Sequence, residues 1–322
     1  MKIRISILVF LLALLSSCNR EIDFEFPDVE PAIVINSIIT PELPISVSIS
    51  AIMPIACESY IDVTKSDEYG FSNTYTIPNP KFVDNASVLM YEDGVLLCSL
   101  EYEGDGYYIS DKYPKVGSTY TLVVNAPGYK ECKSTTTLYN MPVLSNMSFR
   151  DTVTVDEEGY PLSKLSFTIT DNNTNRNFYE ISCRAVSNKY DVEYEWIYFN
   201  SSRNNDKVLA QSECLPLNNR VLLFTDDCFS NGSYNLEVIY NYLMYVAMAK
   251  YDLEITVKSI SESYYEYRRS RMMQAYQEVG LYEDFAYGET LSYIPVDIYS
   301  NIENGYGVFA SYSTMTDTIM RR

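Results

Sequence analysis

The chain has 322 residues, and its 24 basic and 43 acidic side chains give a formal net charge of −19. Such a chain repels phosphate, so nucleic acid is excluded as an expected partner. The sequence contains no histidine, which excludes Ser-His-Asp or Cys-His catalysis and histidine-ligated zinc. We therefore expect no enzyme, no cofactor and no metal site, although chemistry that uses only carboxylates stays open.

The N-terminus has the pattern of a secretory signal. Lys2 and Arg4 precede an almost wholly apolar run over residues 5–15, which is shorter than the roughly 20 residues that span a bilayer. The run ends at Leu15-Ser16-Ser17-Cys18, which resembles the bacterial lipobox, where the cysteine thiol takes a diacylglycerol. We predict a signal peptide over residues 1–17 and lipidation of Cys18. An ordinary signal peptide with an incidental cysteine is the alternative.

Residues 18–31 are predicted to form a lipidated acidic tether. Asn19 stands where Asp is the usual signal for retention in the inner membrane, so we expect the outer membrane. The following segment, residues 20–25, is acidic and resembles the surface-export signal of Bacteroidota lipoproteins, although a merely solvated tether would look the same. The expected location is the outer membrane, lipid-anchored and exposed at the cell surface.

Residues 32–141 are predicted to form a β-sandwich domain. Residues 45–50 alternate strictly between apolar and polar side chains, and an Asp93-Gly94 turn separates two strand-like runs. Short strands and turns repeated in this way predict an immunoglobulin-like sandwich. The stretch also resembles the carboxypeptidase regulatory-like sandwich at Ala86-Ser87-Val88, Gly106-Tyr107-Tyr108, residues 117–122 and Ala126-Pro127-Gly128-Tyr129. That resemblance implies a structural or adhesive module.

Within this region, residues 56–84 are polar and rich in Ser, Asn, Asp and Pro. We predict a long loop there, and loops carry binding more often than cores do. Tyr60, Tyr69 and Tyr75 are spaced like exposed anchors. They are the predicted contacts with a partner.

Residues 142–322 are predicted to form a larger β-rich domain with one helix at about 263–279. Ser263 and Glu266 fit a capping box at the start of this helix, and Gly280 fits its end. The predicted buried stripe consists of Tyr265, Met272, Tyr276 and Val279. The basic cluster Arg268, Arg269 and Arg271 is either a solvated helix face or a patch for an acidic ligand.

Several smaller features carry their own expectations. Cys214 and Cys228 flank a short segment and could form a disulfide, whereas Cys98 and Cys183 lie on apolar faces and are expected to be free buried thiols. Thr152 and Thr318 each follow an Asp in a short pattern that matches Bacteroidota O-glycosylation acceptors. Ordinary residues at a strand edge are the alternative for both threonines.

Three segments of the C-terminal half resemble one family. They are Ser259–Tyr267, Phe224–Phe229 followed by Asn231-Gly232, and Val296–Phe309. The chain is similar over nearly all of its mature length to the Bacteroidota lipoproteins called domain of unknown function 4249. Members are typically encoded beside TonB-dependent outer-membrane receptors. The resemblance implies an accessory role in uptake, with no known enzyme, cofactor or substrate.

Two further functions remain open. One is an adhesive or structural surface module, which a sandwich fold would suit. The other is a carboxylate-only hydrolase, for which the tandem Asp226-Asp227 is the acid candidate. Because adjacent strand residues face opposite sides, a turn is the favoured interpretation of this pair.

Overall fold

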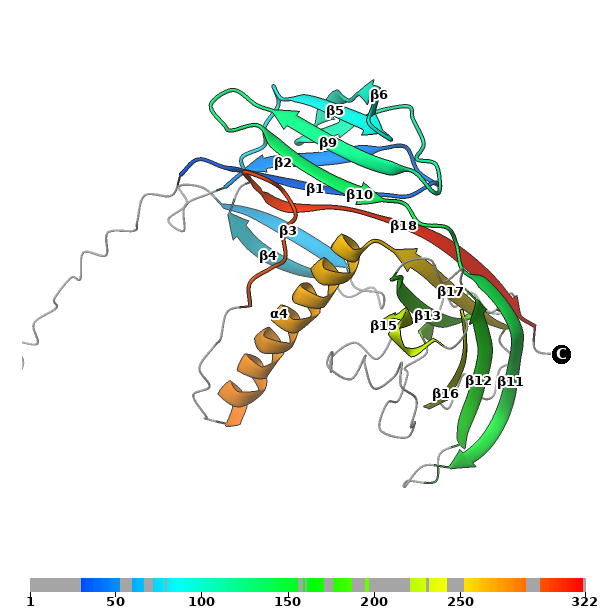
Figure 1. The fold of residues 1–322 in the computed structure, drawn as a ribbon. Helices are drawn as coiled ribbons and strands as arrows, with labels where there is room; N and C mark the ends of the chain where they lie inside the picture. The colour runs from blue at the N-terminus through cyan, green and yellow to red at the C-terminus, as the bar shows by residue number, and fades with distance from the viewer. Residues whose placement is uncertain are drawn as a thin grey trace, which may run out of the picture. The chain divides into compact units, whose positions relative to one another are not determined.

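The computed structural model describes residues 30–52, 60–66, 72–78, 80–155, 159, 161–170, 176–186, 195–196, 221–229, 232–241, 252–287 and 296–320. These residues fold mainly as β-strands arranged in several sheets, with one α-helix in the described ranges (Figure 1). The mainly β class with one helix, predicted from the sequence, is thus confirmed. Contacts divide the chain into two units, the first made of Met1–Glu30 and Met53–Pro78 and the second of all other residues.

The described part of the first unit is a β-hairpin. Strands β3 (Tyr60–Ser66) and β4 (Ser72–Pro78) pair antiparallel, with Tyr60 opposite Pro78 and Val63 opposite Tyr75. The predicted long loop over residues 56–84 is therefore wrong. Its many Ser, Asn and Asp residues suggested a loop, but the Ile, Val, Thr and Tyr residues between them favour strands.

The second unit contains two β-sandwiches. In the first, one layer holds β1 (Ile33–Ile39), β2 (Ser46–Ala51), β7 (Glu101–Gly104) and β8 (Tyr107–Ile109). The other layer holds β5 (Ser87–Glu92), β6 (Val95–Ser99), β9 (Thr119–Asn125) and β10 (Cys132–Thr137). Alternate residues of β2 and β9 are buried, so each layer contributes one face to a shared apolar core.

The second sandwich follows the same plan with longer strands. One layer holds β13 (Phe178–Val186), β14 (Glu195–Trp196), β15 (Val221–Thr225), β17 (Asp252–Ile260) and β18 (Tyr306–Ile319). The other layer holds β11 (Val143–Val155), β12 (Pro161–Thr170) and β16 (Ser233–Asn241). The core between the layers includes Phe167, Ile181, Leu236 and Ile255, all fully buried.

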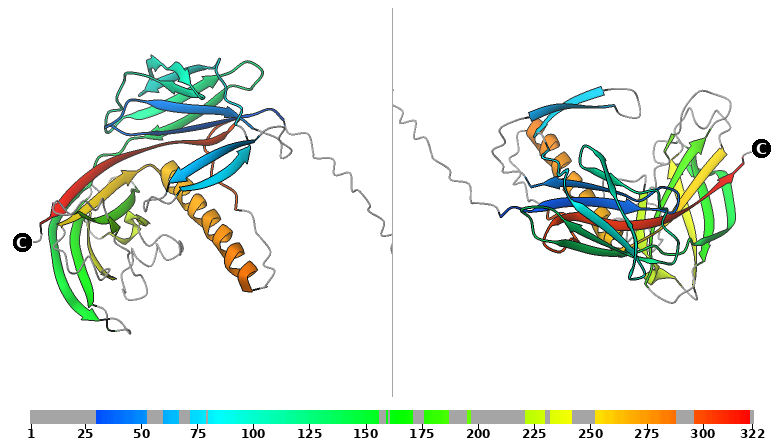
Figure 2. Two further views of the ribbon diagram at one scale, coloured as in Figure 1. Left: turned by 180° about the vertical axis from the view of Figure 1, so that it is seen from behind. Right: turned by 90° about the horizontal axis from the view of Figure 1, so that it is seen from above.

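Strand β18 belongs to both sandwiches. Its first half pairs in parallel with β1, from Tyr306 to Ser311, and its second half pairs antiparallel with β17, from Tyr312 to Ile319. The two layers therefore form one continuous nine-stranded sheet, along which β18 runs as the long red strand in Figures 1 and 2. The domain boundary near residue 142 stays a prediction, and β18 supplies residues to the strand layers on both sides of it.

The start of β18 includes a position that requires glycine. Gly307 has a φ of +102°, and a Cβ added there would lie 2.1 Å from the carbonyl oxygen of Ile35 on β1. Next to it, the side-chain amide of Asn301 donates to the carbonyl of Phe309 at 2.8 Å and accepts from the Phe309 amide at 2.9 Å. The segment Val296–Phe309 thus fixes the parallel pairing of β18 with β1, which gives it a structural role.

The helix α4 (Glu262–Tyr287) starts close to the predicted position and continues well beyond the predicted end at Gly280. The predicted capping box is also wrong. Ser261 caps the helix, because its hydroxyl accepts from the Tyr264 amide at 3.2 Å, while the Ser263 hydroxyl donates to the Phe309 carbonyl at 3.0 Å. The contact with β18 therefore uses the side chain that the sequence pattern assigned to the cap.

Candidate functional site

The sheet formed by β13, β17 and β18 has two different faces. On one face, residues such as Ile181 and Ile255 are buried in the core of the second sandwich. Because strand residues alternate, the residues between them lie on the opposite face. The register places Glu180 opposite Lys258 and Arg184 opposite Glu254 on that face, so it carries charged pairs.

The first turns of α4 pack at one end of this charged face. Phe178, Ile260, Tyr264 and Val308 form a small buried cluster there, with Tyr265 and Tyr312 against it. Tyr265, which the predicted stripe included, contacts Phe178 with ring centroids 5.0 Å apart. The side chains of Tyr276 and Val279 lie outside the described residues.

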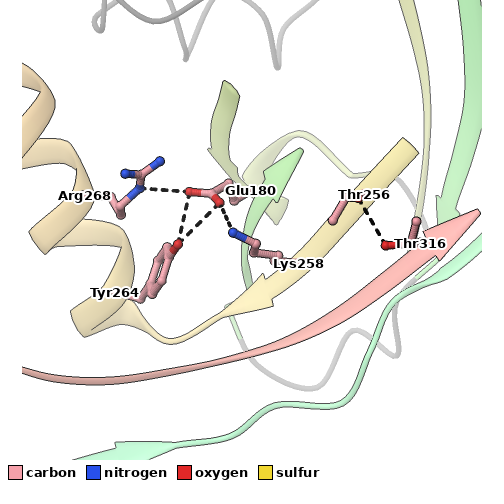
Figure 3. A network of polar contacts seen from close by, with 6 residues as sticks. All are labelled: Glu180, Thr256, Lys258, Tyr264, Arg268 and Thr316. Carbon is pink, nitrogen blue, oxygen red and sulfur yellow. Dashed lines mark hydrogen bonds and ion pairs between the residues drawn. The ribbon is translucent and has the colours of Figure 1, made fainter. Parts of the chain in front are cut away.

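Four side chains meet where the helix approaches the sheet, and we call them the Glu180 cluster (Glu180, Lys258, Tyr264 and Arg268; Figure 3). The ammonium of Lys258 donates to Glu180 Oε1 at 2.5 Å, and Arg268 Nε donates to Oε2 at 3.0 Å. The hydroxyl of Tyr264 is 3.3 Å and 3.4 Å from the two carboxylate oxygens. One carboxylate thus lies against polar groups from two elements, β17 and the first two turns of α4.

The electrostatics of the Glu180 cluster follow from its burial. Only 4% of the Glu180 side chain is exposed, and a carboxylate buried to that extent requires charged partners. Burial is the largest single influence on Lys258 and lowers its pKa, but the combined attraction of Glu180, Tyr264 and Tyr312 outweighs it, so this pKa lies above its ordinary value. Burial also lowers the pKa of Arg268, and the combined attraction of Glu180, Tyr264 and Tyr267 raises it above its ordinary value. Both cations are charged at neutral pH, so the cluster carries one excess positive charge.

Aromatic rings and one hydroxyl complete the surroundings. Lys258 Nζ lies 5.0 Å from the ring centroid of Tyr312 and 5.9 Å from that of Tyr264, within the range of cation–π attraction. Thr314 is the cross-strand neighbour of Lys258 on β18. Its buried hydroxyl oxygen has no hydrogen-bond partner in the described part of the protein. A buried hydroxyl without a hydrogen-bond partner lowers the stability of the fold. Such a position is therefore a candidate for a contact with a ligand.

A second ion pair on the same two strands provides a comparison. Among the described residues, Arg184 on β13 pairs with Glu254 on β17, which places one cation on this carboxylate. Other described pairs, such as Lys115 with Glu92 and Lys164 with Glu237, are also matched one to one. The Glu180 cluster differs from these pairs in having two cations on a single carboxylate.

The tandem Asp226-Asp227 is part of a turn. Asp226–Cys228 form one turn of 3-10 helix, capped by Thr225. The Thr225 hydroxyl and the Arg176 guanidinium, each 2.8 Å from Asp227 Oδ2, hold the pKa of this carboxyl below its ordinary value. Asp227 therefore stays ionised at neutral pH. A general acid needs a raised pKa instead, so the geometry favours the structural role.

Phe229 continues this turn into the core. Its ring stacks between the rings of Tyr179 and Tyr234, with both centroid separations at 5.5 Å. The segment Phe224–Phe229, which carries part of the family resemblance, thus links β15 to β16 through aromatic packing. Its role is again structural.

The other predicted site residues are placed as follows. Cys18, Tyr69 and Cys214 lie outside the described residues, as do the side chains of Tyr60, Tyr75 and Cys228. The Cys214–Cys228 disulfide and the tyrosine contacts therefore stay predictions. Thr152 on β11 and Thr318 on β18 are exposed, and their glycosylation also stays a prediction. Cys98 and Cys183 are free thiols, of which Cys183 is buried and Cys98 half-buried.

Sequence reasoning identified Arg268 as part of a basic cluster but missed Glu180, Lys258 and Tyr264. The signal that could have found them is the alternation in β13 and β17, which leaves a Glu and a Lys on the face opposite the apolar residues. Such a pattern does not say which residues face each other. Glu180 and Lys258 are 78 residues apart, so their contact depends on the register of the folded sheet.

The fold and the cluster define a mainly β protein in which two sandwiches share one strand and a positively charged cluster lies beside the helix α4. The chain belongs to the family described as "Domain of unknown function (DUF4249)", whose model matches residues 19–318. No curated protein matches the chain.

One solved structure that matches is a crystal structure described as that of a membrane-anchored protein from Corynebacterium diphtheriae, at 9% sequence identity and a TM-score of 0.19. The match covers 72% of this chain and 55% of that one, so the chain spans about half the length of that protein. A TM-score this low carries no argument about fold or function. Among the described residues, no helix combines the length and the apolar character needed to cross a membrane.

Proposed function

We propose that this chain is a non-catalytic lipoprotein of a Bacteroidota outer membrane that serves as an accessory of a TonB-dependent transporter. A lipid on Cys18 would hold it at the cell surface. The lipobox pattern at Leu15–Cys18, the acidic tether and the family resemblance support this proposal, and the lack of histidine argues against catalysis.

The observation that carries a binding role is the Glu180 cluster. Lys258 and Arg268 are held by one carboxylate, and the cluster keeps an excess positive charge within a chain of net charge −19. Neither cation has a neighbouring serine or cysteine nucleophile among the contacts that define the cluster. This arrangement suits the holding of a cargo rather than its conversion.

Membrane confinement makes a weak interface sufficient. Two or three acyl chains anchor a protein stably, because each buried CH₂ contributes about 0.8 kcal/mol. A lipoprotein and a receptor in the same membrane then meet at a high effective concentration. An accessory of this kind needs no large interface to stay with its transporter.

An adhesive surface module is the alternative that the architecture favours. The two sandwiches are joined through one continuous sheet, and β-sandwiches are common in cell-surface proteins. The resemblance of residues 32–141 to the carboxypeptidase regulatory-like sandwich supports the same alternative. The two functions differ in the partner that each requires.

Co-purification tests the proposed function. The full-length lipidated chain is extracted in mild detergent, and its partners are identified by mass spectrometry. We expect a TonB-dependent receptor with wild type and none with Cys18→Ala, which should leave the outer-membrane fraction because it cannot be acylated. If the wild-type protein brings down no receptor, the accessory role is wrong. Recovery of fimbrial components would instead support the adhesive alternative.

A further inference from the structure

We propose that the Glu180 cluster binds a carboxylate group of a ligand, with Arg268 and Lys258 as the donors. The inference rests on the proposed function, because it names the chemical class of the cargo. Three observations carry it: the unused donors of Arg268, the partnerless hydroxyl beside Lys258 and the excess positive charge.

Arg268 is held in position but only partly used. Its Nε donates to Glu180 at 3.0 Å, and no partner is found in the described part of the chain for its two terminal nitrogens. Figure 3 shows these nitrogens directed away from Glu180. The side chain is 33% exposed, so a ligand can reach it. Guanidinium nitrogens form a planar fork that matches the two oxygens of a carboxylate.

Lys258 offers donors on the same side of the sheet. One of its three N–H groups is used by Glu180 and a second lies against the Tyr264 hydroxyl, and 25% of its side chain is exposed. The hydroxyl of Thr314, its neighbour across β17 and β18, is buried without a partner. A ligand oxygen at this position would satisfy that hydroxyl and the remaining N–H group of Lys258 together.

The excess charge and the rings narrow the class of ligand. One excess positive charge is balanced by a monoanion, which favours a carboxylate over a phosphate dianion. Tyr312 lies against Lys258, whose Nζ is 5.0 Å from the centroid of its ring. This tyrosine is half-buried and offers apolar ring surface beside the charged groups. The ligand therefore carries its carboxylate on a ring whose face can pack against a tyrosine, as aromatic acids and acidic sugars both do.

Calorimetric titration of the full-length protein in mild detergent tests this inference and separates the two sources. Benzoate is compared with its neutral isostere benzamide, and galacturonate with galactose. We expect at least one carboxylate to bind, its neutral counterpart to show no measurable binding, and the affinity to fall as sodium chloride is raised. Binding of benzoate alone would indicate aromatic acids, and binding of galacturonate alone would indicate acidic sugars. If neither carboxylate binds better than its neutral counterpart, the inference is wrong.

Two variants locate the binding. Arg268→Gln should weaken the binding of the carboxylate by about ten- to a hundredfold, as expected for a lost hydrogen bond between charged groups. Arg184→Gln, which changes the matched pair on the same strands, should leave the affinity unchanged. Equal losses in both variants would overturn the assignment of the site. A thermal melt confirms that each variant is folded, and the salt dependence of wild type tests the inference without any substitution.

The outcomes keep this inference separate from the proposed function. If a receptor co-purifies but no carboxylate binds, the accessory role stands and the assigned ligand class falls. If a carboxylate binds at Arg268 but no receptor co-purifies, the binding site stands and the transporter partnership falls.

Discussion

Each of the two sandwiches places a carboxylate beside a tyrosine hydroxyl and a cation, but with a different balance of charge. In the first, Glu92 accepts from the buried Tyr120 hydroxyl at 2.6 Å and pairs with Lys115 at 2.8 Å. The Tyr120 oxygen also accepts from the Lys115 amide at 2.6 Å. In the second, Glu180 holds Lys258, Arg268 and the Tyr264 hydroxyl.

The difference separates groups that stabilise the fold from groups that can also bind. Around Glu92, one cation matches one carboxylate, and the tyrosine oxygen is used as both donor and acceptor. Around Glu180, one positive charge and the terminal nitrogens of Arg268 remain. Polar groups that satisfy one another's charges and hydrogen bonds leave no donor for a ligand. Donors that have no matching acceptor and are held in a fixed geometry remain available to bind one.

The largest expected effect comes from separating the two sandwiches at the strand they share. In Gly307→Ala, the new Cβ would meet the carbonyl oxygen of Ile35, and the φ of +102° would be strained. We expect a loss of about 2–6 kcal/mol in the free energy of unfolding, from strain of about 1–3 kcal/mol plus overpacking of about 1–3 kcal/mol. Urea unfolding measures the loss.

Gly94→Ala is the matched control for that variant. Gly94 also has a positive φ, of +80°, but nothing lies within 4 Å of its added Cβ. Strain alone should then cost about 1–3 kcal/mol. Equal losses in the two variants would show that the close approach of β18 to β1 does not determine the requirement for glycine.

Removal of the charge on Glu180 should have the next largest effect. Glu180→Gln leaves Lys258 and Arg268 side by side without their anion, which costs about 3–5 kcal/mol in a fully buried site. Because both cations are partly exposed, we expect about 2–4 kcal/mol, measured by urea unfolding. Glu254→Gln on the same strands should cost about 1 kcal/mol or less. Similar losses in the two variants would remove the distinction between matched and unmatched pairs.

High pH should destabilise the first sandwich through Tyr120. Burial and the hydrogen bond to Glu92 raise the pKa of Tyr120 from 10.0 to about 12. Below pH of about 10 this tyrosine keeps its full contribution to stability. Between pH of about 10 and 12 the unfolded chain loses the proton first, so the free energy of unfolding falls, by about 2–3 kcal/mol in total.

The other tyrosines also lose protons at high pH, so the free energy of unfolding of wild type is compared with that of Tyr120→Phe. Urea unfolding at pH 8, 10, 11 and 12 should show that the difference in this free energy between the two proteins narrows or reverses as pH rises. A difference that stays constant over this range would mean that Tyr120 titrates normally.

The smallest expected effect on stability concerns the hairpin of β3 and β4. Because contacts place it in a unit of its own, replacing residues 60–78 by a flexible linker should leave the main melting transition unchanged. If Tyr60 and Tyr75 contact the partner, the same variant should lose co-purification with the receptor. A receptor that is still recovered would remove the hairpin from the proposed interface, and a lowered melting temperature would show that it supports the sandwiches.

The sequence was informative wherever structure depends on neighbouring residues. Strict alternation in Ile45–Ser50 predicted a strand that the structure contains at 46–51, because a half-buried strand repeats every two residues. The Asp93-Gly94 turn and the position of the helix followed from equally local signals.

What the sequence could not predict depends on contacts between distant segments. The parallel pairing of β1 with β18 joins opposite ends of the chain, and the Glu180–Lys258 contact requires a register that no local pattern encodes. The helix cap was misplaced for a similar reason, since the Ser263 hydroxyl bonds to Phe309 on a distant strand. Local propensity was overridden by tertiary contacts in each case.

The most direct test of the Glu180 cluster as a ligand site compares two arginines within one protein. Arg268 and Arg184 each donate through Nε to a glutamate of the same sheet. Their side-chain N–H signals can be followed by NMR in nitrogen-15-labelled protein, with Arg268→Gln and Arg184→Gln for assignment. On titration with galacturonate or benzoate, we predict that the Arg268 signal shifts and saturates while the Arg184 signal stays in place. Equal shifts at the two arginines, or no shift at Arg268, would contradict the assignment.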